Sequence, residues 1–212
     1  MKRKRGHNNV RNPPHIEEKI VLATGNPGKA QEIRNIFSIL APRWDLVTPA
    51  ELGIEIPYPP EQEDYAANAS AKALAATEVS GLPGLAEDSG LEVDALDGRP
   101  GVHSARYGSD DADRIQKLLK ELASTARRFR TARFRCLAVL VLPNGKSWTG
   151  EGIWEGVITT EPRGEHGFGY DPVFFDPLLG KTAAEMTSEE KNARSHRTRA
   201  FADLLGKINT DV

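Results

Sequence analysis

The stretch Lys19-Ile-Val-Leu-Ala-Thr24, followed by Gly25-Asn-Pro-Gly28, decides the type of fold. An apolar run this short, bounded by turn residues, is typical of a buried strand. Glycine and proline then break the chain. Residues 29–40 place apolar side chains at helical spacing, which predicts a helix with one buried face. The chain therefore opens as strand, tight turn and helix.

The rest of the chain alternates between expected strands and helices. A hairpin with Pro143-Asn-Gly145 at its turn lies near the middle, and it favours a mixed sheet in an α/β fold over a purely parallel one. Thr187 and Glu190 have the spacing of a capping box at the start of a last helix. The expected strands cover residues 44–47, 132–142, 148–159 and 172–175, and the expected helices cover residues 64–80, 110–123 and 187 to about 207.

Residues 84–96 are interpreted as two strands joined by a sharp turn at Asp88-Ser89-Gly90, since these residue types favour turns. No repeat or linker interrupts residues 19–212, which predicts a single domain there. Residues 1–18 differ, because the basic cluster Lys2-Arg-Lys-Arg5 precedes a polar segment with prolines. That composition predicts a disordered basic tail, with a nucleic-acid arm or targeting signal as the alternative.

The composition of the 212 residues is that of an ordinary globular protein, with 27% charged and 39% hydrophobic residues. The net charge of -2 argues against a stable nucleic-acid partner. No apolar stretch approaches the ~20 residues needed to span a membrane. Cys136 is the one cysteine and lies in an apolar run, so it is expected to be a buried thiol in a reducing compartment. These features favour a cytoplasmic location.

The turn from Thr24 to Lys29 could bind phosphate. A turn between a strand and a helix directs backbone N–H groups toward an anion, and Lys29 adds a cation. The spacing is not that of a P-loop, because only two residues separate Gly25 from Gly28 and Ala30 follows the lysine. A structural turn with a surface lysine is the alternative.

Adjacent carboxylates at Glu87 and Asp88 could bind a hard cation such as Mg²⁺ together with substrate phosphates. Successive strand residues point to opposite faces, so only one of the two is expected in the site. Asp88 could also act as a general base toward water. A surface turn is the alternative. Glu61, Glu63 or Asp64 could provide a second ligand.

Two further segments carry candidate site residues. Residues 164–172 combine glycines with aromatic rings, which suits close backbone approach and stacking on a base. In residues 191–197, His196 and Arg197 would not share a face of a regular helix, so joint binding requires a helix start or break nearby. His103 and His166 show no metal-ligand spacing.

Taken in order, these segments resemble the Ham1-like family of inosine triphosphate pyrophosphatases from about residue 20 to residue 205. The resemblance rests on Thr24-Gly-Asn-Pro-Gly-Lys29, Glu87-Asp-Ser-Gly-Leu91, Gly101-Val-His-Ser-Ala-Arg-Tyr107, Gly167-Phe-Gly-Tyr-Asp-Pro172 and Lys191 with Ser195-His-Arg197. It implies an elongated mixed central sheet flanked by helices, with two lobes around a substrate cleft, usually in a homodimer. It also implies Mg²⁺-dependent hydrolysis of inosine, deoxyinosine and xanthosine triphosphates (ITP, dITP and XTP) to the monophosphate and pyrophosphate.

By matching position, the resemblance implies that Asp88 is the metal ligand and proton acceptor. Lys191, His196 and Arg197 would complete the pocket and read the 6-oxo group of the base. The other implied substrate-binding residues are Thr24, Gly25, Asn26, Pro27, Gly28, Lys29, Lys72, Ser89, Phe168, Gly169, Tyr170 and Asp171.

One stretch departs from the family pattern. The family often has Phe-x-Glu-Asn where this chain reads Tyr65-Ala-Ala-Asn68, so Ala67 replaces a glutamate. The upstream family glutamate falls on Pro60, or on Glu61 after a slip of one residue. Glu61 is therefore the expected second metal ligand and Glu63 the alternative. Two other functions remain open: a Maf-like pyrophosphatase acting on other modified nucleotides, and a non-catalytic nucleotide- or RNA-binding module.

Overall fold

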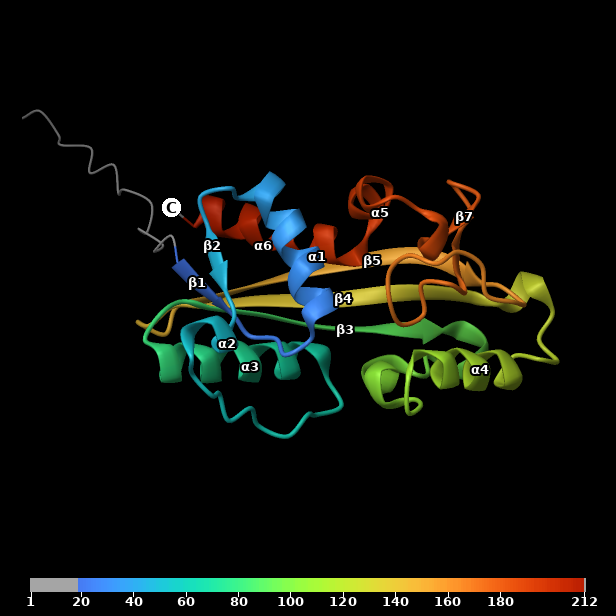
Figure 1. Ribbon diagram of the computed structural model, residues 1–212, viewed down its shortest axis with the longest axis horizontal. Helices are drawn as coiled ribbons and strands as arrows, with labels where there is room; N and C mark the ends of the chain where they lie inside the picture. The colour runs from blue at the N-terminus through green and yellow to red at the C-terminus, as the bar shows by residue number, and fades with distance from the viewer. Residues whose placement is uncertain (1–18, 212) are drawn as a thin grey trace, which may run out of the picture.

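The computed structural model describes residues 19–211, which form one seven-stranded mixed sheet flanked by helices (Figure 1). The strand order is β2-β1-β3-β4-β5-β6-β7; β1 is parallel to β2 and β3, and the other pairs are antiparallel. This arrangement confirms the predicted α/β class and mixed sheet. The strands are β1 (Lys19–Leu22), β2 (Asp45–Val47), β3 (Gly84–Val93), β4 (Thr131–Val141), β5 (Ser147–Ile158), β6 (Phe174–Asp176) and β7 (Lys181–Thr182).

Helices cover both faces of the sheet. In Figure 1, α1, α5 and α6 lie on one side of the long strands, and α2, α3 and α4 lie on the other. β1, β2 and α1 gather at one end of the elongated sheet, and α4 and β7 at the opposite end. The helices are α1 (Pro27–Leu40), α2 (Pro49–Leu52), α3 (Tyr65–Ser80), α4 (Asp111–Glu121), α5 (Ser188–Arg194) and α6 (His196–Thr210), with 3-10 turns η1 (Asp94–Leu96), η2 (Gly101–Arg106), η3 (Arg127–Phe129) and η4 (Ala183–Glu185).

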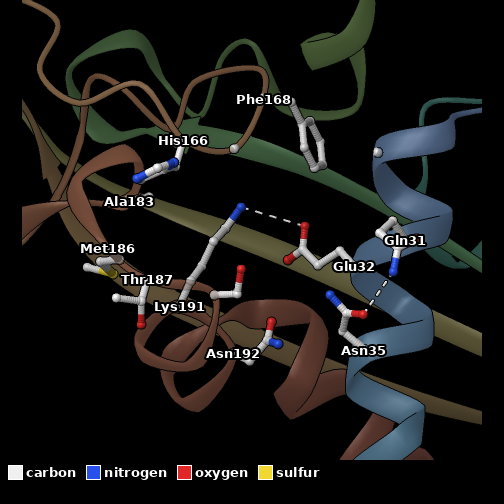
Figure 2. Close-up of a pocket in the computed structure, with 13 residues that line it drawn as sticks. Gln31, Glu32, Asn35, His166, Phe168, Ala183, Met186, Thr187, Lys191 and Asn192 are labelled. Atoms are coloured by element: carbon white, nitrogen blue, oxygen red, sulfur yellow. Dashed lines mark hydrogen bonds and ion pairs between the residues drawn. The ribbon is translucent and has the colours of Figure 1, made fainter.

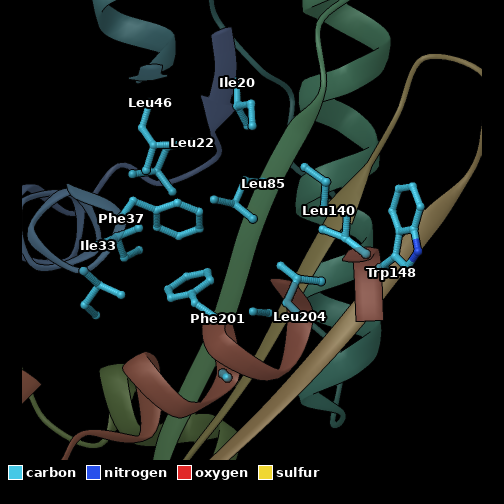
Figure 3. Close-up of a cluster of buried hydrophobic side chains, with 14 of the residues drawn as sticks. Ile20, Leu22, Ile33, Phe37, Leu46, Leu85, Leu140, Trp148, Phe201 and Leu204 are labelled. Carbon is cyan, nitrogen blue, oxygen red and sulfur yellow. The ribbon is translucent and has the colours of Figure 1, made fainter. Parts of the chain in front are cut away.

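An apolar cluster holds α1 and α6 against the sheet (Figure 3). Phe37 of α1 and Phe201 of α6 meet edge to face, with ring centroids 4.9 Å apart, over Leu85 of β3. Both rings are almost fully buried. Burying a phenylalanine side chain stabilises a fold by about 1.5–3 kcal/mol. This packing fixes α1 and α6 relative to β3.

Small residues bring α3 unusually close to the other face of the sheet. Ala69, Ala73 and Ala76 are fully buried there. A Cβ atom on Gly84 of β3 would lie 2.2 Å from the Ala73 carbonyl oxygen, so only glycine fits at this crossing. Asp64 caps the helix, as predicted, by accepting a 2.7 Å hydrogen bond from Ala67 N. The close approach places the polar side chains of α3 beside β3.

The predicted turn at Asp88-Ser89-Gly90 is wrong, because β3 runs unbroken from Gly84 to Val93. Glu87 and Asp88 pair with Ala138 and Leu137 of β4. β1 pairs with β3 only at Gly84 and Leu85. Within residues 19–211, β4 is therefore the one strand that pairs with Glu87 and Asp88. Cations from neighbouring helices, described below, compensate their charge in place of a solvated turn.

The predicted single last helix is also wrong, because α5 and α6 are separated at Ser195. Ser195 has extended backbone angles and caps α6, with its Oγ accepting a 3.2 Å hydrogen bond from Thr198 N. This break is the feature that joint binding by His196 and Arg197 requires. The capping box of Thr187 and Glu190 is confirmed at the start of α5.

Two glycines of β5 let α6 rest directly on the strand backbone. A Cβ atom on Gly150 would lie 2.2 Å from the Ala200 carbonyl oxygen, and one on Gly152 would lie 2.0 Å from the His196 carbonyl oxygen. The helix therefore lies closer to β5 than any side chain at these positions would allow.

Cys136 is buried and unpaired, as predicted. Within residues 19–211, no helix combines the length and apolar character required to cross a membrane. The tail predicted for residues 1–18 lies outside the described residues.

Candidate active site

The candidate site surrounds the end of β1, where the chain turns into α1. A pocket of about 540 Å³ opens there between α1, the glycine-rich loop and α5 (Figure 2). Lys191 projects from α5 toward Glu32 of α1, and the ring of Phe168 lies above them. A second, smaller hollow reaches from Phe168 past Ser89 to His196 and also includes Lys29 in its wall.

The turn before α1 is organised by its own side chains. Thr24 Oγ1 accepts a 3.2 Å hydrogen bond from Asn26 N, and Asn26 Oδ1 accepts a 3.0 Å bond from Lys29 N. Pro27 occupies the first turn of the helix, where its missing N–H group costs nothing. Gly28 lies under Phe168, because a Cβ atom there would be 3.4 Å from that ring. The turn therefore presents a helix N-terminus and Lys29 to the pocket.

Glu87 is buried between two cations. Its Oε1 lies 2.8 Å from Lys29 Nζ and 3.7 Å from Arg197 Nε. Burial opposes ionisation of this carboxyl, but the charges of Lys29 and Arg197 outweigh burial and hold the pKa of Glu87 well below its ordinary value. Cys136 Sγ lies 3.4 Å from Glu87 Oε2. Glu87 is thus an ionised anchor for the two cations.

Glu32 and Asp171 both contact Lys191 of α5, and Glu32 also contacts Arg197. Lys191 Nζ lies 2.7 Å from Asp171 Oδ2 and 3.6 Å from Glu32 Oε2. Arg197 Nη1 lies 3.3 Å from the same Glu32 oxygen. Asp171 also accepts a 2.9 Å hydrogen bond from Phe168 N, which fixes the glycine-rich loop. Carboxylates from three separate chain segments therefore position the cations around the pocket.

The aromatic ring of Phe168 lies beside two positive charges. Lys191 Nζ is 5.1 Å and the Arg197 guanidinium carbon 5.3 Å from the ring centroid. Arg197 Nη2 also donates a 2.9 Å hydrogen bond to Ser89 Oγ. Gly169 N donates to Asp111 Oδ2, and Tyr170 OH donates to the Ser104 carbonyl oxygen. The loop therefore offers one flat, cation-flanked ring to a ligand.

His196 begins α6 and is buried against Phe134, with ring centroids 4.8 Å apart and planes inclined by 14°. Burial, followed by the charge of Arg197, lowers the pKa of His196 well below its ordinary value, so the imidazole is neutral near pH 7. Its Nδ1 and Arg197 Nε have no hydrogen-bond partner among residues 19–211. Both residues line the smaller hollow, which places them where a ligand could meet them.

Asp88 points to the opposite face of β3, toward α3. Asn68 Nδ2 donates a 3.0 Å hydrogen bond to Asp88 Oδ2, and Lys72 Nζ lies 3.0 Å from Asp88 Oδ1. Lys72 Nζ also lies 3.1 Å from Glu61 Oε1, so one ammonium group bridges the two carboxylates. Glu63 instead pairs with His103 Nε2 at 2.8 Å. The geometry favours Glu61 over Glu63 as the partner of Asp88.

The carboxylates on this face fit a divalent cation. A positive charge, that of Lys72, already lies between Asp88 and Glu61, and both groups offer the hard oxygen ligands that Mg²⁺ prefers. Across residues 19–211 no cluster of three metal-ligating side chains occurs. Two carboxylates suffice where waters and substrate phosphates complete the coordination of Mg²⁺.

Most of the predicted residues gather in this region, on the two faces of β3. Sequence reasoning missed Glu32, although it lies three residues after Lys29 at helical spacing. It also set Glu87 aside because strand alternation admits only one of the pair to the Asp88 face. The alternation is confirmed, but Glu87 contributes from the other face, where it holds Lys29 and Arg197 beside the pocket. Asn68, which donates a hydrogen bond to Asp88, was also missed.

Comparison with known proteins adds independent information. A family model described as the Ham1 family matches residues 20–207. The chain is 45% identical to a dITP/XTP pyrophosphatase of Yersinia pseudotuberculosis over 200 residues, covering 90% of this chain and 98% of that one. It is 47% identical to a dITP/XTP pyrophosphatase of Thermus thermophilus over 189 residues, covering 88% and 90%.

Solved structures agree with these sequence relatives. The Ham1 protein of Staphylococcus aureus superimposes with a TM-score of 0.77 at 34% identity, covering 92% of this chain and 100% of that one. A HAM1 protein from Coxiella burnetii gives a TM-score of 0.76 at 39% identity, covering 92% and 99%. With the cation-lined pocket, the paired carboxylates and a match across nearly the whole described chain, the protein belongs to the Ham1 family.

Proposed function

We propose that the protein hydrolyses non-standard purine nucleoside triphosphates, such as ITP, dITP and XTP, to the monophosphate and pyrophosphate in the presence of Mg²⁺. The observation that carries this proposal is the arrangement of opposite chemistries on the two faces of β3. Lys29 and Arg197 line the face with the aromatic pocket, and Asp88 and Glu61 line the other. A nucleotide bridging both faces would place its base and its phosphates in different surroundings.

The polyphosphate would lie at the turn between β1 and α1. The backbone N–H groups of a helix N-terminus attract anions, and Lys29 adds a positive charge. Lys72 adds a second cation from α3, across β3. These donors are fixed by the protein before substrate arrives, so they can stabilise charge that develops on the leaving pyrophosphate without reorganisation.

Asp88 and Glu61 would hold the metal ion, which when bound supplies neutralisation of phosphate charge. Asp88 would also orient a water molecule and accept its proton as the water attacks phosphorus. Asn68 fixes the orientation of the Asp88 carboxylate through its 3.0 Å hydrogen bond. Fixing a carboxylate in this way directs its free lone pairs toward the reacting water.

The base would lie against Phe168, with His196 and Arg197 reading its edge. Arg197 Nε is a buried donor with no hydrogen-bond partner among the described residues. A 6-oxo group on hypoxanthine or xanthine would accept from such a donor. Adenine carries an amino group there, so donor would face donor at a cost of about 1–3 kcal/mol, which corresponds to about tenfold or more in preference.

The test is pyrophosphate release from ITP, dITP, XTP, ATP, GTP and dTTP, with and without Mg²⁺ and with the nucleoside product identified. The proposal expects fast, metal-dependent conversion of ITP, dITP and XTP to monophosphates, with ATP and GTP much slower. Preference for dTTP would indicate a Maf-like activity. No turnover of any triphosphate would leave a binding module.

Two further properties follow from the family resemblance. We expect a homodimer, which light scattering coupled to gel filtration measures, and a cytoplasmic location, which cell fractionation measures.

A further inference from the structure

The 3-10 turn η2 carries the segment Gly101-Val-His-Ser-Ala-Arg106, to which the proposed function gives no role. Ser104 anchors this turn on two sides. Its Oγ accepts a 2.8 Å hydrogen bond from Leu91 N of β3, and its carbonyl oxygen accepts a 2.9 Å bond from Tyr170 OH of the glycine-rich loop. The last residue of η2, Arg106, is therefore held in place relative to both walls of the candidate site.

Arg106 ends a row of alternating charges that begins at β3. Asp88 contacts Lys72 at 3.0 Å, and Lys72 contacts Glu61 at 3.1 Å. The second oxygen of Glu61 contacts the Arg106 guanidinium. Half of the Arg106 side chain is exposed (50%), so this end of the row faces solvent and an incoming ligand.

The charges in this row cancel, since two carboxylates face two cations. A divalent cation at Asp88 and Glu61 would replace Lys72 and Arg106 as their counter-charge. The row would then carry two positive charges in excess, beside a substrate whose triphosphate is strongly negative. A guanidinium group matches phosphate oxygens through two parallel N–H donors.

We propose that Arg106 is a further substrate-binding residue. Its guanidinium group would release Glu61 and bind a phosphate oxygen, first of the triphosphate chain and then of the product pyrophosphate. This inference rests on the proposed function for its substrate. The rival explanation is that Arg106 only holds Glu61 in position. The two explanations differ in their effect on metal binding. Removing a competing cation leaves Mg²⁺ affinity equal or tighter, whereas removing a support for Glu61 weakens it.

The test is calorimetric titration of the wild type and Arg106→Gln with MgCl₂ alone and with pyrophosphate at fixed free Mg²⁺, alongside kcat and KM for ITP. The matched control is Arg99→Gln, an exposed arginine that pairs with Glu121 outside the site. We expect pyrophosphate affinity to fall about tenfold or more in Arg106→Gln, with Mg²⁺ affinity unchanged or higher and KM for ITP raised. Arg106→Lys should recover part of the affinity, and Arg99→Gln should match the wild type.

Unchanged pyrophosphate affinity in Arg106→Gln, or weaker Mg²⁺ binding by the same factor, would overturn the proposal. A wild type that binds no pyrophosphate would overturn it as well. If the wild type binds pyrophosphate but does not hydrolyse ITP, the proposed function fails, and the pyrophosphate titration still decides the role of Arg106. Thermal unfolding of each variant confirms that the fold is retained, and Arg106→Lys serves if Arg106→Gln is unstable.

Discussion

Glu87 and Asp88 are adjacent in sequence and chemically alike, but they face two different environments. The Glu87 side chain is 2% exposed and lies between Lys29 and Arg197, which belong to the pocket. The Asp88 side chain is 10% exposed and leads through Lys72 to Glu61, whose side chain is one-third exposed. The pleat of a single strand separates these environments.

The difference suggests a division of labour between the two faces. On the buried face, low exposure holds the charges in place, and they position the groups that are proposed to contact the base. On the Asp88 face, cations lie between carboxylates close to solvent, where a metal ion and phosphates can replace them. Recognition requires the first environment and reaction requires the second.

The largest expected effect is on catalysis, from a substitution on the Asp88 face of β3. Asp88→Asn keeps the shape of the side chain but removes the proton acceptor and a metal ligand, so kcat/KM for ITP should fall about 10³-fold. Circular dichroism and thermal unfolding should stay close to wild type. Asp45→Asn, at an exposed position of β2, is the control. Activity within tenfold of wild type in Asp88→Asn would remove Asp88 from the chemistry.

On the Glu87 face of β3, the substitution Glu87→Gln should lower the free energy of unfolding. The change leaves Lys29 and Arg197 with less compensating charge in a buried place, and breaking a buried ion pair costs about 3 kcal/mol or more. Urea unfolding measures this loss. The control, Glu155→Gln, removes an exposed partner of Arg133 and should cost less than about 1 kcal/mol. Equal losses in the two variants would show that the buried face is not special.

On the Asp88 face, separate substitutions of Glu61 and Glu63 would show which of the two carboxylates binds the metal ion. Glu61 shares Lys72 with Asp88, whereas Glu63 pairs with His103. Glu61→Gln should therefore raise the Mg²⁺ concentration needed for half-maximal activity by about tenfold. Glu63→Gln should leave that concentration within about twofold of wild type, since it touches neither carboxylate. The reverse result would move the metal site toward η2.

The smallest expected effect is on acid stability. The folded-state pKa of Glu87 lies below its ordinary value of 4.5, so its ionised form stabilises the fold above that pH. This contribution is lost as the pH falls below 4.5. In Glu87→Gln the contribution is absent at every pH, so the difference in unfolding free energy from wild type should shrink on acidification. A difference that stays constant from pH 6 to pH 3 would contradict this account.

The elements with strong local signals were predictable from the sequence. The strand, turn and helix at the start, the hairpin of β4 and β5, and the cap at Asp64 all depend on residues close together in the chain. The motif residues were also recognisable from the family resemblance. These features require no knowledge of what packs against them.

Other features depend on distant partners and were not predictable. Asp88-Ser89-Gly90 has turn chemistry, but Lys72 and Asn68 of α3 make its acidic residue acceptable inside a strand. The break at Ser195 was required for joint binding by His196 and Arg197, yet the local pattern still read as one helix. Glu32 and Glu87 became part of the site only through cations brought from other segments.

The start of α6 rests on the backbone of β5 at Gly152, which carries no side chain. The carbonyl oxygen of His196 would lie 2.0 Å from a Cβ atom there, so the seating depth of the helix is set by the absence of a single methyl group. Any side chain at Gly152 would displace the start of α6, and with it His196 and Arg197, the two residues proposed to read the base. Under the proposed function, a substitution at Gly152 would therefore change discrimination among purines from beneath α6, without touching the nucleotide.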